Sequence, residues 1–245
     1  MRILLTILFM VWMNACMAQQ SDAIHYTSLN TAIYLGQYDG TETAGELKQF
    51  GDFGLGSEER LASELILLDG VLYSIPATGK LTRMKADARI PFAAVKNFIA
   101  EKKFSIKKKL TFEQLQGVLD SLIGPNRFAA VKITGRFSFI QFRSFVEQTK
   151  PYRPLEEAEE VFFDHKDFQG TLVGFFTPKS AEALNSPVYH FHVVDQKFTT
   201  GGHLTACLIV DAIIEVDFAS QLIIDLPSVE NLNQINLNQE VEKKN

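Results

Sequence analysis

Three of the five histidines in this 245-residue chain fall within one short segment, at His190, His192 and His203. Residues two apart on a β-strand share a face, so His190 and His192 are expected to point the same way. The segment DQKFTTGG comes next, and its Gly201-Gly202 pair permits the unusual backbone angles of a tight return. An antiparallel return strand that begins at His203 would bring the third imidazole beside the first two.

Three imidazoles in this arrangement are suited to one metal ion, because imidazole nitrogens are common ligands of zinc. Three protein ligands leave a coordination position open for a substrate, which is typical of catalytic rather than structural zinc sites. Imidazole also suits copper, iron and nickel, so the spacing by itself leaves the metal open. The alternative from spacing alone is a group of core or surface histidines that bind no metal.

Two charged residues stand in apolar strand patterns. Arg143 continues one face of the alternating segment 130–145, a face formed otherwise by Val131, Ile133, Phe137 and Phe139. A buried guanidinium needs an anionic partner, which is either a substrate carboxylate or a structural Asp or Glu. The remaining alternative is that this end of the strand already lies in water. Glu64 precedes the apolar run Leu65–Leu68, where it is either a rim residue or a desolvated acid with a raised pKa.

The elements that must position these residues are mostly strands. Asp69-Gly70 predicts a hairpin between Glu64–Leu68 and Val71–Ile75. Helices are predicted near 29–35, over 94–102 and over 111–123, the last with a capping-box pattern at Thr111 and Gln114. Further strands are expected at 130–145, 170–176, 188–194, 203–218 and 223–226. The predicted fold class is α+β, with mostly antiparallel or mixed β-sheets, a few helices, and the metal site on a β-hairpin of the C-terminal half.

The pattern divides the chain into four regions: a signal peptide at 1–18, an N-terminal α/β sheet region at 19–125, a C-terminal β-rich metal-binding region at 126–228, and a tail at 229–245. In the first region a single charge, Arg2, precedes an apolar stretch and small residues up to Ala18, which is typical of a secretory signal. Cleavage after Ala18 would release an exported protein, periplasmic or secreted. Lipidation of Cys16 would instead tether the protein to a membrane.

Composition limits the binding partners and the disulfides that we expect. The net charge of −5 provides no basic surface, so nucleic acid is not an expected partner. Cys207 is the other cysteine besides Cys16, and it lies in the apolar run ACLIV. Without a second cysteine after processing it has no internal disulfide partner, and we expect it to be a small core residue.

Several segments, in this order, resemble those of the alpha-acetolactate decarboxylase family over nearly the whole chain after the signal. GDFGLG and ELILLDGVLYSI resemble its N-terminal signature, FAAVKITGRFSFIQFRSF resembles its central strand pair with KPYRPL directly after it, and GTLVGFFTP resembles the strand before the metal site. The most specific segment is YHFHVVDQKFTTGGH, which is similar to the family's metal-binding segment. One departure is Ala62-Ser63, where the family usually has Asp-Gly before the glutamate, and it affects the local loop geometry.

The resemblance implies one zinc ion per chain on the three histidines, with Glu64 and Arg143 as catalytic residues and Ser57 as a substrate-binding hydroxyl. It also implies that a glutamate of the tail reaches the metal, for which Glu242 is the best match and Glu240 the next. The implied reaction is the decarboxylation of 2-acetolactate, a 2-hydroxy-3-oxo acid, to acetoin and carbon dioxide. The metal would act as a Lewis acid that stabilises an enediolate. The implied assembly is a homodimer.

Two other classes of protein stay open at this point. A cupin-like exported β-domain that binds metal or sugar without this activity also uses H-x-H on a strand. Such modules usually place a glutamate three to five residues later, and here those positions are Asp195, Gln196 and Lys197, of which only Asp195 could substitute. The third class is an exported interaction protein that has lost its activity, against which the retained histidines, Glu64 and Arg143 argue.

Overall fold

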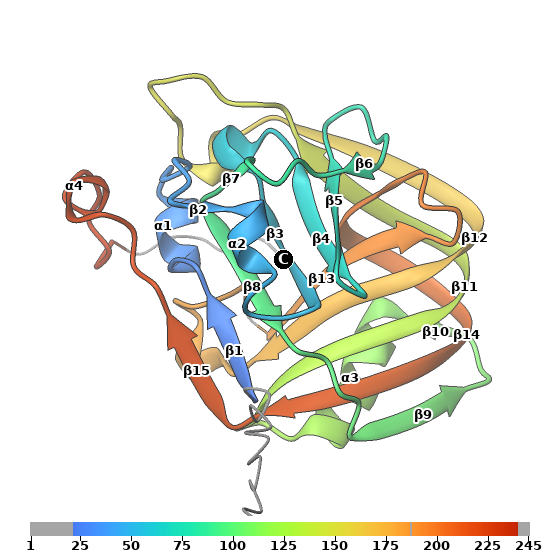
Figure 1. Ribbon diagram of the computed structural model, residues 1–245. Helices are drawn as coiled ribbons and strands as arrows, with labels where there is room; N and C mark the ends of the chain where they lie inside the picture. The colour runs from blue at the N-terminus through green and yellow to red at the C-terminus, as the bar shows by residue number, and fades with distance from the viewer. Residues whose placement is uncertain (1–21, 187, 240–245) are drawn as a thin grey trace, which may run out of the picture.

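The computed structural model describes residues 22–186 and 188–239, which fold into two main β-sheets with few helices (Figure 1). The predicted α+β class is confirmed, and the histidine group lies in the C-terminal half. The expected signal peptide at 1–18 with Cys16, and the tail residues Glu240 and Glu242, lie outside the described residues. Within the described ranges, no helix has the length and apolar character needed to cross a membrane.

The first sheet has seven strands in the order β15-β1-β8-β3-β4-β5-β6. Their bounds are β1 Ala23–Tyr26, β3 Phe53–Ser57, β4 Glu64–Leu68, β5 Val71–Ile75, β6 Thr82–Arg83, β8 Phe92–Lys96 and β15 Gln221–Ile224. The pair β1–β15 is parallel, and the pairs that join the other strands are antiparallel. The sheet is therefore mixed, and its edge is completed by a strand from near the C-terminal end of the described chain.

The predicted β4–β5 hairpin is confirmed. Leu68 pairs with Val71 across the turn, and both Asp69 and Gly70 have positive φ angles, as a two-residue hairpin turn of this kind requires. Every residue of β4 is buried, because one face of the strand packs in the core between the two sheets and the other face is covered by a separate apolar cluster. Glu64 therefore starts a strand that is held firmly on both sides.

The second sheet has six strands. Five of them lie in the order β10-β14-β11-β12-β13, and β9 also pairs with β14. Their bounds are β9 Lys102–Ile106, β10 Leu110–Thr111, β11 Phe128–Phe145, β12 Glu160–Thr177, β13 Val188–Asp195 and β14 Gly201–Ala219. Because β14 pairs with both β11 and β13, the four long strands form a closed circuit. Figure 1 shows these long strands running beside the first sheet.

Two cores hold these layers together. One lies on the inner side of the circuit, where helix α3 (Phe112–Ile123) contributes Leu115 and Leu119, and the predicted capping box at its start is confirmed. Cys207 is buried in this core, as expected. The other core lies between the sheets and joins residues such as Ile66 and Phe175. Burying one large aliphatic side chain stabilises such a core by roughly 1.5–3 kcal/mol.

Short elements complete the described chain. They are α1 Asn30–Tyr34, β2 Glu42–Thr43, α2 Ala44–Leu47, η1 Glu59–Leu61, β7 Arg89–Ile90, η2 Leu155–Glu157, η3 Lys179–Ala181 and α4 Val229–Leu232. The helix expected near 29–35 is present as α1, while α4 lies apart from both sheets in Figure 1. Strands β2 and β7 pair with each other as a separate small sheet.

The helix predicted over 94–102 is wrong. Residues Phe92–Lys96 form β8, which is buried along its length between β1 and β3, and β9 begins at Lys102. A strand buried on both faces has a continuous apolar pattern, so periodicity does not separate it from a short buried helix. Strands β9 and β10 join the second sheet and β15 joins the first, so segments cross between the sheets. The division of the chain at residues 125 and 228 remains a prediction.

Candidate metal centre

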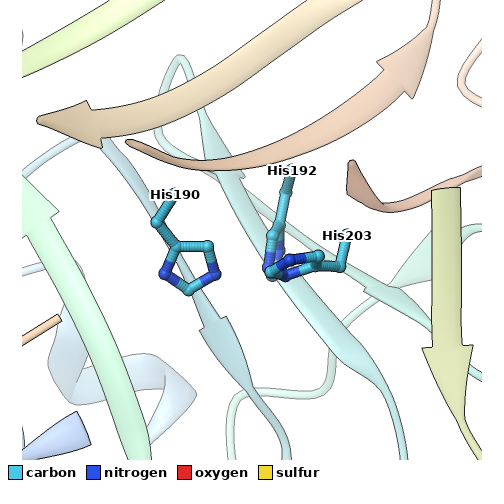
Figure 2. A group of neighbouring side chains, drawn as sticks. All are labelled: His190, His192 and His203. Atoms are coloured by element: carbon cyan, nitrogen blue, oxygen red, sulfur yellow. The ribbon is translucent and has the colours of Figure 1, made fainter. Parts of the chain in front are cut away.

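The β13–β14 hairpin gathers the three histidines. Alternation along β13 directs Tyr189 and Phe191 into the core of the circuit and leaves His190 and His192 on the opposite side. His203 pairs directly with His192 across the hairpin. One ring nitrogen from each of the three buried histidines lies within 4.8 Å of the others, and Figure 2 shows the three rings gathered together. The predicted geometry of the histidine group is confirmed.

Gly202 sets the close approach of β14 to β11. Its φ angle is +153°, and a Cβ at this position would lie only 2.6 Å from the Arg143 carbonyl oxygen. No larger residue fits there without moving the backbone. The strands pair so that Arg143 lies opposite His203, and His203 lies opposite His192. The cationic side chain and two imidazoles therefore stand in one row across three neighbouring strands.

The local hydrogen bonds of His192 leave one of its nitrogens free to bind a metal. Its Nδ1 atom lies 2.8 Å from the Leu65 carbonyl oxygen, which can only accept, so Nδ1 carries the proton. Its Nε2 lone pair then faces the site, buried and without a hydrogen bond to a described residue, although Glu64 Oε2 lies 3.3 Å away. A buried acceptor left this way is unfavourable, and a metal ion would satisfy it. The donor set thus fits a zinc ion.

Burial keeps all three histidines neutral, which is the form that binds metal. It lowers the pKa of His190 and of His203 well below the usual value for histidine, with the charge of Arg143 acting in the same direction. It lowers the pKa of His192 to about 3, a shift that the hydrogen bond to Leu65 opposes in part. No proton therefore competes for these nitrogens near neutral pH.

Glu64 stands beside this group at the start of β4, where it pairs with Ser57 of β3. Its Oε2 atom is 3.3 Å from His192 Nε2. Burial raises the pKa of Glu64 to about 7, an effect that the charge of Arg143 opposes and that of Glu160 reinforces. Glu64 is therefore a desolvated carboxyl group that can hold a proton near neutral pH, and not a rim residue.

Arg143 faces the same site, but its predicted position on the face of Val131 and Ile133 is wrong. Register shifts in the pairing of β11 with β14 around Phe137–Phe139 exchange the two faces of the strand. Ile140 and Phe142 consequently fill the core of the circuit. Arg143 turns to the other side, where its guanidinium lies over the Phe145 ring.

The anionic partners of Arg143 include structural carboxylates. Its Nε atom lies 2.9 Å from Glu160 Oε1, and its Nη1 atom lies 3.4 Å from Glu64 Oε1. Side-chain exposure is 9% for Arg143 and 32% for Glu160, so the ion pair spans the boundary between the interior and the solvent. Glu160 holds one edge of the guanidinium, while Arg143 also lines the pocket with the histidines.

These residues line one pocket. His190, His192, His203, Glu64, Arg143 and Ser57 all line it, so the structure brings together the sequence-predicted residues that it describes. Ser57 Oγ is buried and has no hydrogen-bond partner in the described part of the chain. It is therefore a candidate to bind a substrate oxygen.

Other walls of the pocket were not predicted from the sequence. They come from α1 and from segments near η1, η2 and the start of β13, and include Asn30, Ile33, Tyr34, Leu61, Leu155 and Ser186. The residues on α1 lie far along the chain from the histidines, and no local pattern marks them. The short helix predicted near 29–35 was the one available indication that this segment is ordered.

The Asp195 alternative for a cupin-like ligand set is not supported by the geometry. Its Oδ1 atom accepts hydrogen bonds from the backbone nitrogens of Thr199 and Thr200, within the β13–β14 turn. Asp195 is also not among the residues that line the pocket. Its carboxylate therefore stabilises the hairpin that carries the histidines.

Comparisons with known proteins agree with one another. The family model described as alpha-acetolactate decarboxylase matches residues 24–239. The alpha-acetolactate decarboxylases of Methanosarcina mazei and Brevibacillus brevis are both 33% identical to this chain over 91% of its length, covering 78% and 79% of theirs. The crystal structure of the Bacillus subtilis strain 168 enzyme superimposes with a TM-score of 0.86 at 30% identity, covering 89% of this chain and 94% of that one.

Proposed function

The chain belongs to the alpha-acetolactate decarboxylase family, and from this premise we propose that it decarboxylates 2-acetolactate to acetoin and carbon dioxide at a zinc ion on His190, His192 and His203. The observation that carries the proposal is one pocket that joins three buried neutral histidines to Arg143 and Glu64. Few other chemistries need a metal-binding group, a carboxylate-binding cation and a proton-holding carboxyl group within the same small volume.

The zinc ion would act as a Lewis acid that draws electron density from the oxo and hydroxyl oxygens of the substrate. His192 is prepared to hold it, because the Leu65 carbonyl fixes its proton on Nδ1. Imidazole ligands alone do not exclude other divalent metals, so zinc is the proposed metal on the strength of the resemblance and the three-nitrogen donor set.

Arg143 is proposed to bind the substrate carboxylate. A guanidinium can donate two parallel hydrogen bonds to a carboxylate, and burial in the pocket strengthens such a contact. Glu160 keeps the Nε edge occupied at 2.9 Å, which leaves the remaining N–H groups for the pocket and for Glu64. This arrangement would orient the bond between the carboxyl carbon and C2 for cleavage.

Glu64 is proposed to supply the proton that completes the reaction. Loss of carbon dioxide breaks the bond between C2 and the carboxyl carbon, and its electron pair moves toward the former oxo oxygen to give an enediolate. The carboxylic acid form of Glu64 then donates a proton to C2, which yields acetoin and the carboxylate form of Glu64. A pKa raised to about 7 supports this role, because a substantial fraction of the group is protonated near neutral pH.

The pocket also supports a small substrate with two methyl groups. Ile33, Leu61 and Leu155 provide apolar wall, and Phe145 stacks on the Arg143 guanidinium at the same site. The unpartnered hydroxyl of Ser57 can donate a hydrogen bond to an oxygen of the bound acid. These contacts favour 2-hydroxy-3-oxo acids with short side chains over long or strongly polar ones.

The test is acetoin formation from racemic acetolactate by the purified chain without residues 1–18. We expect turnover that a chelator abolishes and that added Zn²⁺ restores. A folded, zinc-loaded protein that produces no acetoin would contradict the proposed substrate. Turnover that survives complete metal removal, checked by elemental analysis, would contradict the metal dependence.

Three further features are part of the same proposal. Glu242, with Glu240 as the second choice, would add a carboxylate ligand from the tail. The chain would be exported, with residues 1–18 removed or Cys16 lipidated, and mass spectrometry of the mature protein distinguishes these two forms. The resemblance supports a homodimer, which analytical ultracentrifugation of the mature chain would detect.

A further inference from the structure

We propose that Asn185 is a positioning residue that fixes the tautomer and the ring orientation of His190, and thereby sets the affinity of the metal centre. The inference rests on the proposed metal site. Asn185 lies in the segment between η3 and β13, five residues before His190, and does not itself line the pocket. Its side chain is completely buried.

Two short contacts converge on one atom of this side chain. Asn185 Oδ1 lies 2.7 Å from His190 Nδ1 and 2.9 Å from the backbone nitrogen of Ser186. The second contact identifies the atom, because a backbone N–H can only donate and the group that faces it must be the amide oxygen. A flipped amide would place an NH₂ group against that N–H and lose the hydrogen bond.

The orientation of the amide determines the proton on His190. Since Oδ1 only accepts, the hydrogen bond at 2.7 Å requires a proton on His190 Nδ1. In a neutral ring with its proton on Nδ1, the lone pair is on Nε2. The same logic applies to His192, whose Nδ1 donates to the Leu65 carbonyl. Both imidazoles of β13 are thus set in the tautomer that offers Nε2 to a shared ion.

The unused end of the Asn185 amide supports this role. Its Nδ2 atom is buried and has no hydrogen-bond partner in the part of the chain that the structure describes. Leaving a buried donor unpaired is unfavourable, so stability alone does not explain an asparagine at this position. The asparagine is explained if an amide oxygen is needed beside His190. Sites where a buried polar group lacks its usual partner are often functional.

Ser186, which directly follows Asn185 in the chain, provides a matched control for disturbance of this segment. Its hydroxyl group contacts Asn30 Nδ2 at 3.3 Å and the Tyr34 hydroxyl at 3.4 Å, which attaches the segment to α1. The hydrogen bond to Asn185 uses the Ser186 backbone nitrogen, so Ser186→Ala removes the side-chain contacts and keeps the amide orientation. A general loosening of this segment would therefore affect Ser186→Ala and a variant of Asn185 alike. Only the variant of Asn185 would lose the contact with His190.

The experiment compares the wild type with Asn185→Leu, Asn185→Asp and Ser186→Ala, using Zn²⁺ alone as the probe. Zinc affinity is measured by competition with a chromophoric chelator, and the tautomer of His190 is read from imidazole ¹⁵N shifts of the metal-free protein. We expect Asn185→Leu to bind zinc about 10–100-fold more weakly, as is usual when the partner of a metal-binding histidine is lost. We also expect it to lose the pure Nδ1–H tautomer. Asn185→Asp keeps an acceptor oxygen, so we expect it to have a zinc affinity close to that of the wild type and the Nδ1–H tautomer of His190.

Either readout can overturn the proposal. If metal-free Asn185→Leu is folded and keeps His190 in the Nδ1–H form, Asn185 does not set the tautomer. If Ser186→Ala weakens zinc binding as much as Asn185→Leu does, the effect belongs to the segment and not to the amide. If the wild type binds no zinc, the proposed metal centre fails, and the tautomer measurement still decides the role of Asn185.

Discussion

Glu64 at the start of β4 and Arg143 near the end of β11 belong to different sheets, yet their Oε1 and Nη1 atoms lie 3.4 Å apart. This separation is longer than that of a strong ionic hydrogen bond, which lies near 2.7–2.9 Å. Arg143 makes its shorter contact with Glu160 instead. The attraction of Arg143 for Glu64 consequently does not outweigh burial, and the pKa of Glu64 stays raised, at about 7.

The first prediction concerns the proton held by Glu64. Glu64→Gln keeps the size and hydrogen-bonding capacity of the side chain but cannot deliver the proton, so we expect kcat to fall about 10²–10⁴-fold. The measurement is the initial rate of acetoin formation at saturating substrate with the zinc content confirmed. Glu215→Gln is a control, because Glu215 pairs with Lys103 and Lys132 away from the pocket. Near-normal turnover by Glu64→Gln would exclude Glu64 as the proton donor.

The second prediction concerns recognition of the substrate carboxylate. Arg143→Lys retains the charge but loses the planar pair of donors, so we expect kcat/KM to fall about 10–100-fold. The control is Arg136→Lys on the same strand, where an exposed arginine pairs with Asp211. That variant should stay within about twofold of the wild type, since surface ion pairs contribute little. Equal losses in the two variants would indicate a general disturbance of β11.

Local sequence patterns predicted the parts of this fold that local physics determines. The Asp69-Gly70 turn requires positive φ angles, and the Thr111–Gln114 box satisfies backbone donors at a helix start, so both were recognisable. The alternation of β13 likewise places His190 and His192 on one face. In each case the signal and the structure lie within a few residues of one another.

Features set by contacts distant in sequence were not predictable in this way. The face of Arg143 depends on the register of β11 against β14, and the shifts around Phe137–Phe139 leave no distinct mark in the sequence. Residues Phe92–Lys96 form a strand because neighbours on both sides bury it. The oxygen of Asn185 and the wall from α1 meet the site through folding of separate segments, so only the structure identifies them.

The third prediction concerns the stability of the metal-free protein in acid. The pKa values of His190, His192 and His203 are lower in the folded state than the usual 6.5, so the unfolded chain binds more protons below that pH. Their contribution to stability is present above pH 6.5 and is lost as the pH falls. Each contributes up to about 1.4 kcal/mol per pH unit. Glu64 acts oppositely, because its raised pKa makes the folded state bind the extra proton between about pH 4.5 and 7.

The three histidines lower the stability as the pH falls, and the single carboxyl group raises it. We therefore expect these groups together to lower the free energy of unfolding by about 2–3 kcal/mol from pH 6 to pH 5. Urea unfolding of chelator-treated protein at several pH values measures this change. The variant His190→Gln should show a shallower pH dependence, because one of the three titrating groups is gone. A free energy of unfolding that is constant or increases as the pH falls from 7 to 5 would contradict the assignment.

The last prediction separates the two tail glutamates, which lie outside the described residues. A carboxylate added to three neutral imidazoles would partly neutralise a divalent ion and so strengthen its binding. We therefore expect Glu242→Gln to weaken zinc binding about 10–100-fold and to lower kcat, while Glu240→Gln and the α4 control Glu230→Gln stay close to the wild type. Zinc competition and acetoin formation are measured on the same preparations. The reverse pattern would transfer the role to Glu240, and an active truncated chain ending at residue 239 would show that neither glutamate is needed.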